Sequence, residues 1–440
     1  MPACQVDDRQ CEPPATRPME PTLQPDPTAV HTQARQTLDR LRAGELQGCT
    51  RLDLRGCGLV ELPAEVLALA DTLEVLDVSG NALGSLPDGL ARLTRLHTLF
   101  ASGNRFTALP PVLGRLPALD TMGFKANRIA DVPAQALAPT LRWLILTDNR
   151  IAALPSTLAD CTRMQKLMLA GNRLTRLPPG MGRLQRLELL RLSANAFERV
   201  EHALTDELLA LPQLAWLAHA GNPFSAAREQ AAQAIATVQP IAWRELRLHA
   251  LLGEGASGHI HAAQWQPADG PVQDVAVKLF KGSVTSDGLP GCEIAATLMA
   301  GSHPQLVGVL GALADHPDGT PGLVLPRLAP HWKPLAGPPS MASCSRDVYG
   351  ADVRLSVARA TSIARAATEA LDHLHACGLT HGDLYAHNLL VDGDDRALLS
   401  DLGAASLLPP DDPPLRAALQ ALDRRALGIL VDELAQHGEP

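Results

Sequence analysis

An asparagine recurs at a nearly constant interval along the first half of the chain. Six asparagines are separated by 23, 23, 22, 23 and 23 residues: Asn81, Asn104, Asn127, Asn149, Asn172 and Asn195. Each stands in the pattern L-x-x-L-x-L-x-x-N-x-L-x-x-L-P, with Cys57 in the same slot one unit earlier and Asn222 after a longer step of 27 residues. This period predicts a stack of similar units, because a single unit of this length cannot bury its leucines alone.

The pattern inside each unit indicates a short strand and not a helix. Its apolar positions, followed by a fixed asparagine and a fixed Leu-Pro step, do not follow a 3.6-residue period. The asparagine can satisfy backbone groups at the bend beyond the strand, and the proline can start the return segment because it needs no donor there. These features resemble the leucine-rich repeats. The resemblance predicts an α/β solenoid of eight units over residues 37–225, with an N-terminal cap helix, then a capping helix and linker over 226–244.

A second domain is predicted from residue 245 by a glycine-rich loop between two apolar, strand-like stretches. Gly253, Gly255 and Gly258 form G-x-G-x-x-G, and glycine is needed where backbone approaches phosphates closely. Alone this signal is weak, but strand follows strand here, whereas the dinucleotide-binding fingerprint requires strand followed by helix. The strand-like Val275–Lys278 then ends on a lysine that can reach phosphates, and Glu293 on a helix-like stretch can pair with it.

The strongest segment for chemistry runs from His381 to Asn388 and is followed by Asp401 in Ser-Asp-Leu-Gly. Asp383 lies five residues before Asn388 and eighteen before Asp401. The order and spacing resemble the catalytic loop H-R-D-L-x-x-x-N and the D-F-G of protein kinases, and residues 423–433 resemble the central helix of the kinase C-lobe. The resemblance implies an α+β two-lobed protein-kinase-like fold over residues 245–440, with ATP and Mg²⁺ as cofactors.

The same resemblance implies roles for individual residues. Asp383 would orient or deprotonate the accepting hydroxyl, and Lys278 with Glu293 would position the nucleotide phosphates. Asn388 and Asp401 would hold magnesium. The residues expected to bind ATP are Gly253, Glu254, Gly255, Ala256, Ser257, Gly258, Ile260, Ala276 and Lys278. The chain is therefore predicted to be an ATP- and Mg-dependent protein kinase acting on serine or threonine.

Three positions depart from the kinase pattern. Gly382 stands where most regulated kinases have arginine, Tyr385 replaces the lysine common in Ser/Thr kinases, and Leu402 replaces the phenylalanine of D-F-G. Without that arginine we expect no switch by a phosphorylated activation loop. The short stretch after Asp401 predicts a shortened C-lobe. His-Gly-Asp also resembles small-molecule kinases acting on aminoglycosides or choline, and a nucleotide-binding pseudokinase with the repeats as scaffold is a further alternative.

The strand residues that alternate with the inward leucines predict the character of the concave face. In the early units these slots hold Arg51, Asp53, Arg55, Asp77 and Ser79. From the third unit onward they hold Phe100, Trp143, Ile145, Met168, Leu189 and Trp216, with Lys125, Lys166 and Arg191 beside them. Large apolar side chains on an open face predict an interface, so we expect a protein partner or substrate there. The alternative is an autoinhibitory contact with the chain's own leader or kinase domain.

Charge, hydropathy and cysteine spacing limit the partners and the cellular location that we expect for the chain. The 47 acidic and 38 basic residues give a net charge of −9 with no long block of one sign, which argues against a nucleic-acid partner. No apolar run reaches about 18 residues and the N-terminus lacks signal-peptide features, so we expect no membrane span and a cytoplasmic protein. The eight cysteines show no zinc-binding spacing. The proline-rich residues 1–36 are expected to form a disordered leader.

Overall fold

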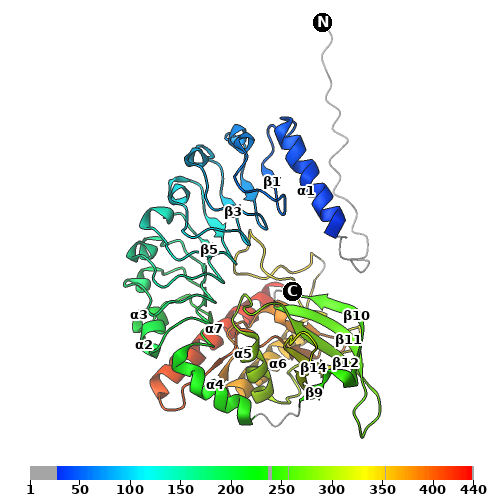
Figure 1. Ribbon diagram of the computed structural model, residues 1–440. Coiled ribbons are helices and arrows are strands. Elements are labelled where there is room, and N and C mark those ends of the chain that lie inside the picture. The colour runs from blue at the N-terminus through cyan, green and yellow to red at the C-terminus, as the bar shows by residue number, and fades with distance from the viewer. Residues whose placement is uncertain (1–26, 236–239, 256, 352, 439–440) are drawn as a thin grey trace.

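Eight short parallel strands form the repeat domain in chain order, one from each predicted unit (Figure 1). The computed structural model describes residues 27–235, 240–255, 257–351 and 353–438. The strands are β1 (Arg51–Asp53), β2 (Val75–Asp77), β3 (Thr98–Phe100), β4 (Thr121–Gly123), β5 (Trp143–Ile145), β6 (Lys166–Met168), β7 (Leu189–Arg191) and β8 (Trp216–Ala218). The predicted solenoid fold is confirmed, and its sheet has eight strands.

The return segments on the convex side are short helices, most of them of the 3₁₀ type. Five of them start directly after the proline of the Leu-Pro step: Pro63, Pro87, Pro110, Pro133 and Pro155. The return helices are η1 (Ala64–Leu69), η2 (Asp88–Arg92), η3 (Pro111–Arg115), η4 (Ala134–Ala136), η5 (Ser156–Asp160), η6 (Met181–Arg183), α2 (Val200–Ala203) and α3 (Asp206–Leu209). Proline thus starts the return as predicted, because its missing donor is one that no helix uses in its first turn.

Each repeated asparagine makes three hydrogen bonds, two to the preceding unit and one within its own unit. Asn172 is typical: its Nδ2 donates to the carbonyls of Leu146 (2.9 Å) and Leu169 (3.0 Å), and its Oδ1 accepts from the backbone N–H of Ile151 (3.1 Å). The same arrangement recurs at Asn81, Asn104, Asn127, Asn149 and Asn195. The side chain therefore satisfies backbone groups that would otherwise be buried without partners.

Asn172→Ala should lower the free energy of unfolding by about 3 kcal/mol, because it leaves the buried N–H of Ile151 without a partner and removes one of two hydrogen bonds at the carbonyls of Leu146 and Leu169. The shift in the midpoint of denaturant unfolding measures this loss. Arg150→Ala is the matched control, since Arg150 is exposed on an adjacent unit and surface changes of this kind alter stability by only about 0.5 kcal/mol. Equal midpoints for the two variants would contradict a stabilising role for the asparagine.

The N-terminal cap helix begins earlier than predicted. Helix α1 spans Pro27–Arg42, and its Leu38 and Leu41 pack into the leucine core of the solenoid. The predicted leader of residues 1–36 therefore needs correction over residues 27–36. Proline is well tolerated at the first position of a helix, so the prolines alone did not mark the boundary. The remainder of that prediction, residues 1–26, lies outside the described residues.

The second domain has two lobes, as predicted (Figure 1). The described part of the N-lobe is a six-stranded sheet in the order β10-β11-β12-β14-β13-β9 with one α-helix, α5, and one short 3₁₀ helix, η7. Its elements are β9 (Ile241–Ala242), η7 (Trp243–Glu245), β10 (Leu246–Glu254), β11 (Gly258–Trp265), β12 (Gln273–Phe280), α5 (Pro290–Ala300), β13 (Gly311–Ala314) and β14 (Gly322–Pro326). The C-lobe consists of β15 (Lys333–Pro334), α6 (Val357–Ala376), β16 (Leu379–Thr380), η8 (Ala386–Asn388), β17 (Leu389–Val391), β18 (Ala397–Leu399), β19 (Ser406–Leu407) and α7 (Pro413–Gln436).

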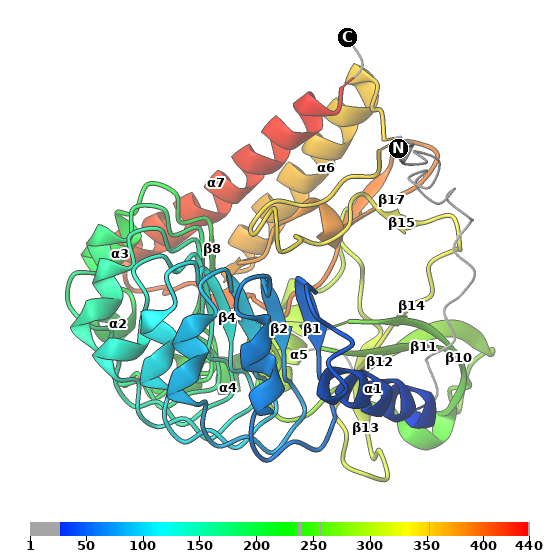
Figure 2. The same ribbon diagram turned by 90° about the horizontal axis from the view of Figure 1, so that it is seen from above.

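The two domains share their apolar cores. Leu408, together with Leu419 and Leu422 of α7, belongs to the same buried cluster as the leucines of the last repeats. The predicted capping helix is present as α4 (Pro223–Ile235), beside the last repeat. Figure 2 shows α7 and α6 running past the C-terminal end of the solenoid. Over the described part of the chain, no helix is long and apolar enough to cross a membrane.

Candidate active site

A cleft of about 320 Å³ lies between the two lobes. Its apolar walls include Ile260 and Ala276, both predicted to bind ATP, and its polar floor includes Asn388 and Asp401. A larger, more open hollow of about 1020 Å³ lies between α4 and the N-lobe, but none of the predicted catalytic residues line it. Lys278, Glu293, Asn388 and Asp401 therefore gather in the smaller cleft.

The glycine-rich turn connects β10 and β11 as an antiparallel hairpin, as predicted. A Cβ atom on Gly258 would lie 2.4 Å from the carbonyl oxygen of Leu279, so the pairing of β11 with β12 requires glycine there. Gly253 and Gly255 have open space where a Cβ would be, so protein packing does not explain them. Glu254 and Ser257 of this turn contact Lys281, and Ala256 lies outside the described residues.

Lys278 and Glu293 form a buried ion pair, as predicted. Lys278 is on β12 and Glu293 is in the first turn of α5, and the lysine Nζ also lies 3.6 Å from Oδ1 of Asp401. Burial works to lower the pKa of the Lys278 ammonium, but the carboxylates of Asp401 and Glu293 raise it above its ordinary value. Lys278 is therefore held as a cation at the back of the cleft.

The loop that carries Asp383 is anchored from below by α7. Both carboxylate oxygens of Asp423 accept from this loop: Oδ2 from the N–H of His381 (2.8 Å) and Oδ1 from the N–H of Gly382 (3.0 Å). The buried His375 of α6 also contacts Asp423 Oδ2, at 3.0 Å. These contacts agree with the resemblance of residues 423–433 to the central helix, and they fix the backbone immediately before Asp383.

Asp383 contacts both Asn388 and a residue of the repeats, Arg191. Its Oδ2 accepts from Asn388 Nδ2 at 3.0 Å, and its Oδ1 is paired with Nη2 of Arg191 on β7. Burial works to raise the pKa of the Asp383 carboxyl, but the charge of Arg191, followed by His387 and His381, lowers it below its ordinary value. Asp383 is therefore held in its ionised form.

Asn388 and Asp401 are the candidate metal ligands. Asn388 donates its amide nitrogen to Asp383, which leaves its amide oxygen for a cation, and Asp401 lines the same cleft. Among the described residues no cluster of three or more His, Cys, Asp or Glu side chains could hold a metal alone. Magnesium needs only one or two protein oxygen ligands when phosphates and water supply the others. The residues present therefore fit Mg²⁺ bound together with a nucleotide.

The predicted patch on the concave face is partly covered by the kinase domain. Leu189 and Trp216 are 4% and 1% exposed, and they belong to the buried cluster of the C-lobe. The ring of Trp216 stacks on Tyr385 with centroids 4.2 Å apart, and its Nε1 donates to the carbonyl of Leu384 at 2.9 Å. The prediction of an open surface is therefore corrected for these two residues.

The other four residues of the patch are less covered. Phe100, Trp143, Ile145 and Met168 are all half-buried. Met168 packs against the C-lobe cluster, and the neighbouring Arg142 donates to the carbonyl of Met341 at 2.8 Å. Partner binding at these four residues stays a prediction.

Sequence reasoning missed two residues of this site. Arg191 was noted only as a neighbour of the apolar patch, and Asp287 was not noted at all. Nothing in the local pattern marks either residue, because their importance arises from contacts between segments almost 100 or more positions apart. The available signal was a single arginine in an outward slot between large apolar residues.

The described fold and cleft define a solenoid of parallel strands joined to a two-lobed kinase-like domain. A family model described as protein tyrosine and serine/threonine kinase matches residues 246–418. Two models described as leucine-rich repeat match residues 139–197 and 72–93. The chain therefore combines leucine-rich repeats with a protein kinase domain.

Two curated relatives are similar to part of the chain. The DNA damage-responsive serine/threonine-protein kinase RqkA of Deinococcus radiodurans is 31% identical over 162 residues, which is 36% of this chain and 22% of the relative. The tyrosine-protein kinase Dnt of Drosophila melanogaster is 29% identical over 171 residues, 38% of this chain and 26% of the relative. The chain thus spans only about a quarter of the length of either protein.

Proposed function

We propose that this chain is a protein kinase that uses ATP and Mg²⁺ to phosphorylate serine or threonine in a protein substrate. The observation that carries the proposal is that Lys278, Asn388 and Asp401 line one cleft and that Asp383 is hydrogen-bonded to Asn388, with Lys278 already paired to Glu293. Phosphoryl transfer depends mainly on positioning and on neutralising charge. This set of side chains supplies both.

Each residue has a role that follows from its place. Lys278, held by Glu293, binds phosphate oxygens as a point charge. Asn388 and Asp401 would hold magnesium, which neutralises phosphate charge when it is bound. Asp383 is ionised, and it orients the acceptor hydroxyl and accepts its proton. Ile260 and Ala276 provide apolar walls for the nucleotide base.

The repeats are proposed to recruit the protein substrate or a regulator. Support comes from the half-buried apolar residues of β3, β5 and β6 that the kinase domain leaves partly open. The relative from Deinococcus is a serine/threonine kinase and that from Drosophila a tyrosine kinase, so the acceptor residue must be measured. The cytoplasmic location also stays a prediction.

Incubation of the full chain with labelled ATP and magnesium tests the proposal, alone and with generic protein substrates. Label on serine or threonine of a protein supports it, and label on tyrosine would change the acceptor. Transfer only to a small alcohol or an aminoglycoside would favour the small-molecule alternative. Nucleotide binding without transfer to any acceptor would indicate a pseudokinase scaffold.

Phosphatase treatment should leave this activity unchanged. Gly382 provides no cation for a phosphorylated activation loop, so no phosphate is needed to order the site. Initial rates before and after treatment, with mass spectrometry to confirm removal of phosphate, measure the effect. A loss of more than about tenfold that re-phosphorylation restores would show that a phosphorylation switch exists.

A further inference from the structure

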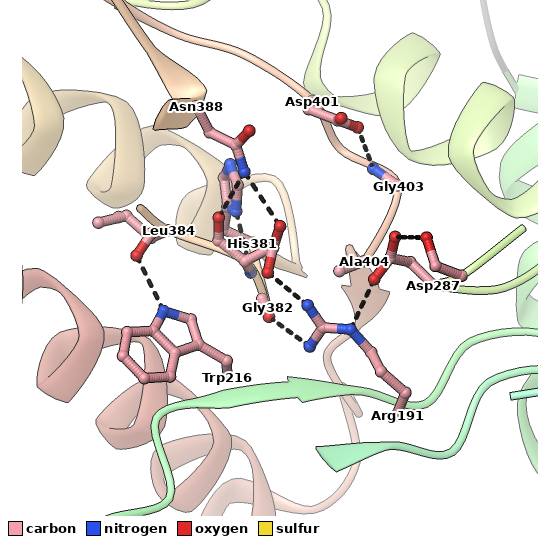
Figure 3. A network of polar contacts seen from close by, with 12 residues as sticks. Arg191, Trp216, Asp287, His381, Gly382, Leu384, Asn388, Asp401, Gly403 and Ala404 are labelled. Atoms are coloured by element: carbon pink, nitrogen blue, oxygen red, sulfur yellow. Dashed lines mark hydrogen bonds and ion pairs between the residues drawn. The ribbon is translucent and has the colours of Figure 1, made fainter. Parts of the chain in front are cut away.

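A guanidinium group from the repeats lies inside the kinase active site. Arg191 of β7 has a side chain only 2% exposed, and three acceptors of the kinase domain surround it (Figure 3). Its Nε donates to Asp287 Oδ1 (2.6 Å), its Nη1 to the carbonyl of Gly382 (3.1 Å), and its Nη2 to Asp383 Oδ1. A buried arginine with each of its nitrogens engaged is held in one geometry.

The acceptors belong to different lobes. Asp287 lies three residues before α5, the helix that carries Glu293, and Asp383 belongs to the catalytic loop of the C-lobe. The segment around Asp287 is seated on the solenoid, since a Cβ on Gly288 would lie 2.9 Å from Cβ of Ser193. One side chain of the repeats therefore connects the start of α5 with the catalytic loop.

The catalytic loop lacks the arginine and the lysine of the kinase pattern at the two positions where the repeats contact it, Gly382 and Tyr385. A Cβ on Gly382 would lie 2.7 Å from the carbonyl oxygen of Leu217 in β8, so no larger residue fits there. Tyr385, at the position of the second missing cation, stacks on Trp216 instead. The positive charge beside Asp383 comes from Arg191.

We propose that Arg191 is a positioning residue of the phosphotransfer site, which orients Asp383 and couples α5 to the catalytic loop. The proposal rests on the kinase function proposed above. It makes the repeats a working part of the active site, so the kinase is competent without a phosphorylated loop. The opposite interpretation, an inhibitory clamp, requires an interface that can open, but here the domains share a continuous apolar core. The Lys278–Glu293 pair is also already formed.

Full-length Arg191→Ala should lower kcat by about a hundredfold, because misplacing a reacting group costs about that much. The KM for ATP should change less than about threefold, since Arg191 does not line the nucleotide cleft. Arg191→Lys keeps the charge but loses the planar set of donors, so its kcat should be about tenfold higher than that of Arg191→Ala. Arg173→Ala, an exposed arginine of the same solenoid, should behave as wild type. A KM effect without a kcat effect, unchanged activity, or increased activity in Arg191→Ala would each overturn the proposal.

Two further measurements keep the test independent of folding and of the acceptor. If Arg191→Ala does not fold, Asp287→Asn leaves Arg191 in place and should still lower kcat by about tenfold, because it weakens only the anchor to α5. An unchanged kcat would count against coupling.

If the wild-type chain transfers no phosphate, the proposed function has failed. Amide hydrogen exchange then tests separately whether Arg191 couples α5 to the catalytic loop. Faster exchange over residues 285–293 and 382–388 in Arg191→Lys than in Arg173→Ala supports coupling, and equal exchange overturns it.

Discussion

Asp383→Asn should lower kcat by about a thousandfold or more while leaving ATP binding nearly intact. The change removes the carboxylate that handles the acceptor hydroxyl, and Asp383 makes none of the contacts expected for phosphates. Asparagine keeps the size of the side chain, and Arg191 retains Asp287 and the carbonyl of Gly382 as acceptors. Lys278→Met should differ, because loss of that cation weakens both nucleotide binding and transfer.

Steady-state transfer rates and the nucleotide dissociation constant, measured on the same preparations, separate these effects. Asp394→Asn is the matched control, since Asp394 lies on the exposed turn between β17 and β18 and its side chain is 85% exposed. Thermal unfolding confirms that each variant is folded. Transfer by Asp383→Asn at a near wild-type rate would remove Asp383 from the mechanism.

Gly382→Ala should lower the free energy of unfolding by about 3 kcal/mol more than Gly378→Ala does. Both glycines have positive φ angles, 71° and 79°, so alanine is strained at either position. The surroundings differ. A Cβ at 382 would lie 2.6 Å from the carbonyl oxygen of Ala404 and 2.7 Å from that of Leu217, whereas a Cβ at 378 meets nothing within 4 Å. Backbone atoms on both sides cannot move away cheaply.

The comparison of these two variants tests how closely the catalytic loop is packed between Ala404 and β8 of the repeats. Gly382→Arg, which restores the arginine of regulated kinases, should be at least as damaging as Gly382→Ala and should gain no activity. Unfolding midpoints and transfer rates of the three variants provide the test. Equal stability of Gly382→Ala and Gly378→Ala would mean that neither Ala404 nor β8 packs closely on the loop.

The solenoid could be predicted from the sequence because its period is local. Every asparagine between 81 and 195 contacts its own unit and its neighbours, so the constraint recurs within about 27 residues. The pairing of Lys278 with Glu293 was predictable for a different reason: the order of the two residues along the chain matches a known arrangement.

The junction of the two domains could not be predicted in this way. The apolar residues Leu189 and Trp216 indicated an interface, but the pattern cannot say whether another protein or another domain of the same chain covers them. The tyrosine that stacks on Trp216 is 169 positions further along the chain. Packing between surfaces so far apart depends on the full three-dimensional arrangement, and no period or motif records it.

The leucine core that passes from the last repeats into α7 limits how the chain can be divided. Leu408, Leu419 and Leu422 are buried in the same core as Leu211 and Leu214. Cutting the chain between the two folds would expose these leucines on both pieces, at a cost of about 2 kcal/mol for each side chain returned to water. Modularity, the usual property of a recognition domain fused to an enzyme, is therefore lost here. Neither half can be exchanged for a homologous part unless its partner surface is exchanged with it.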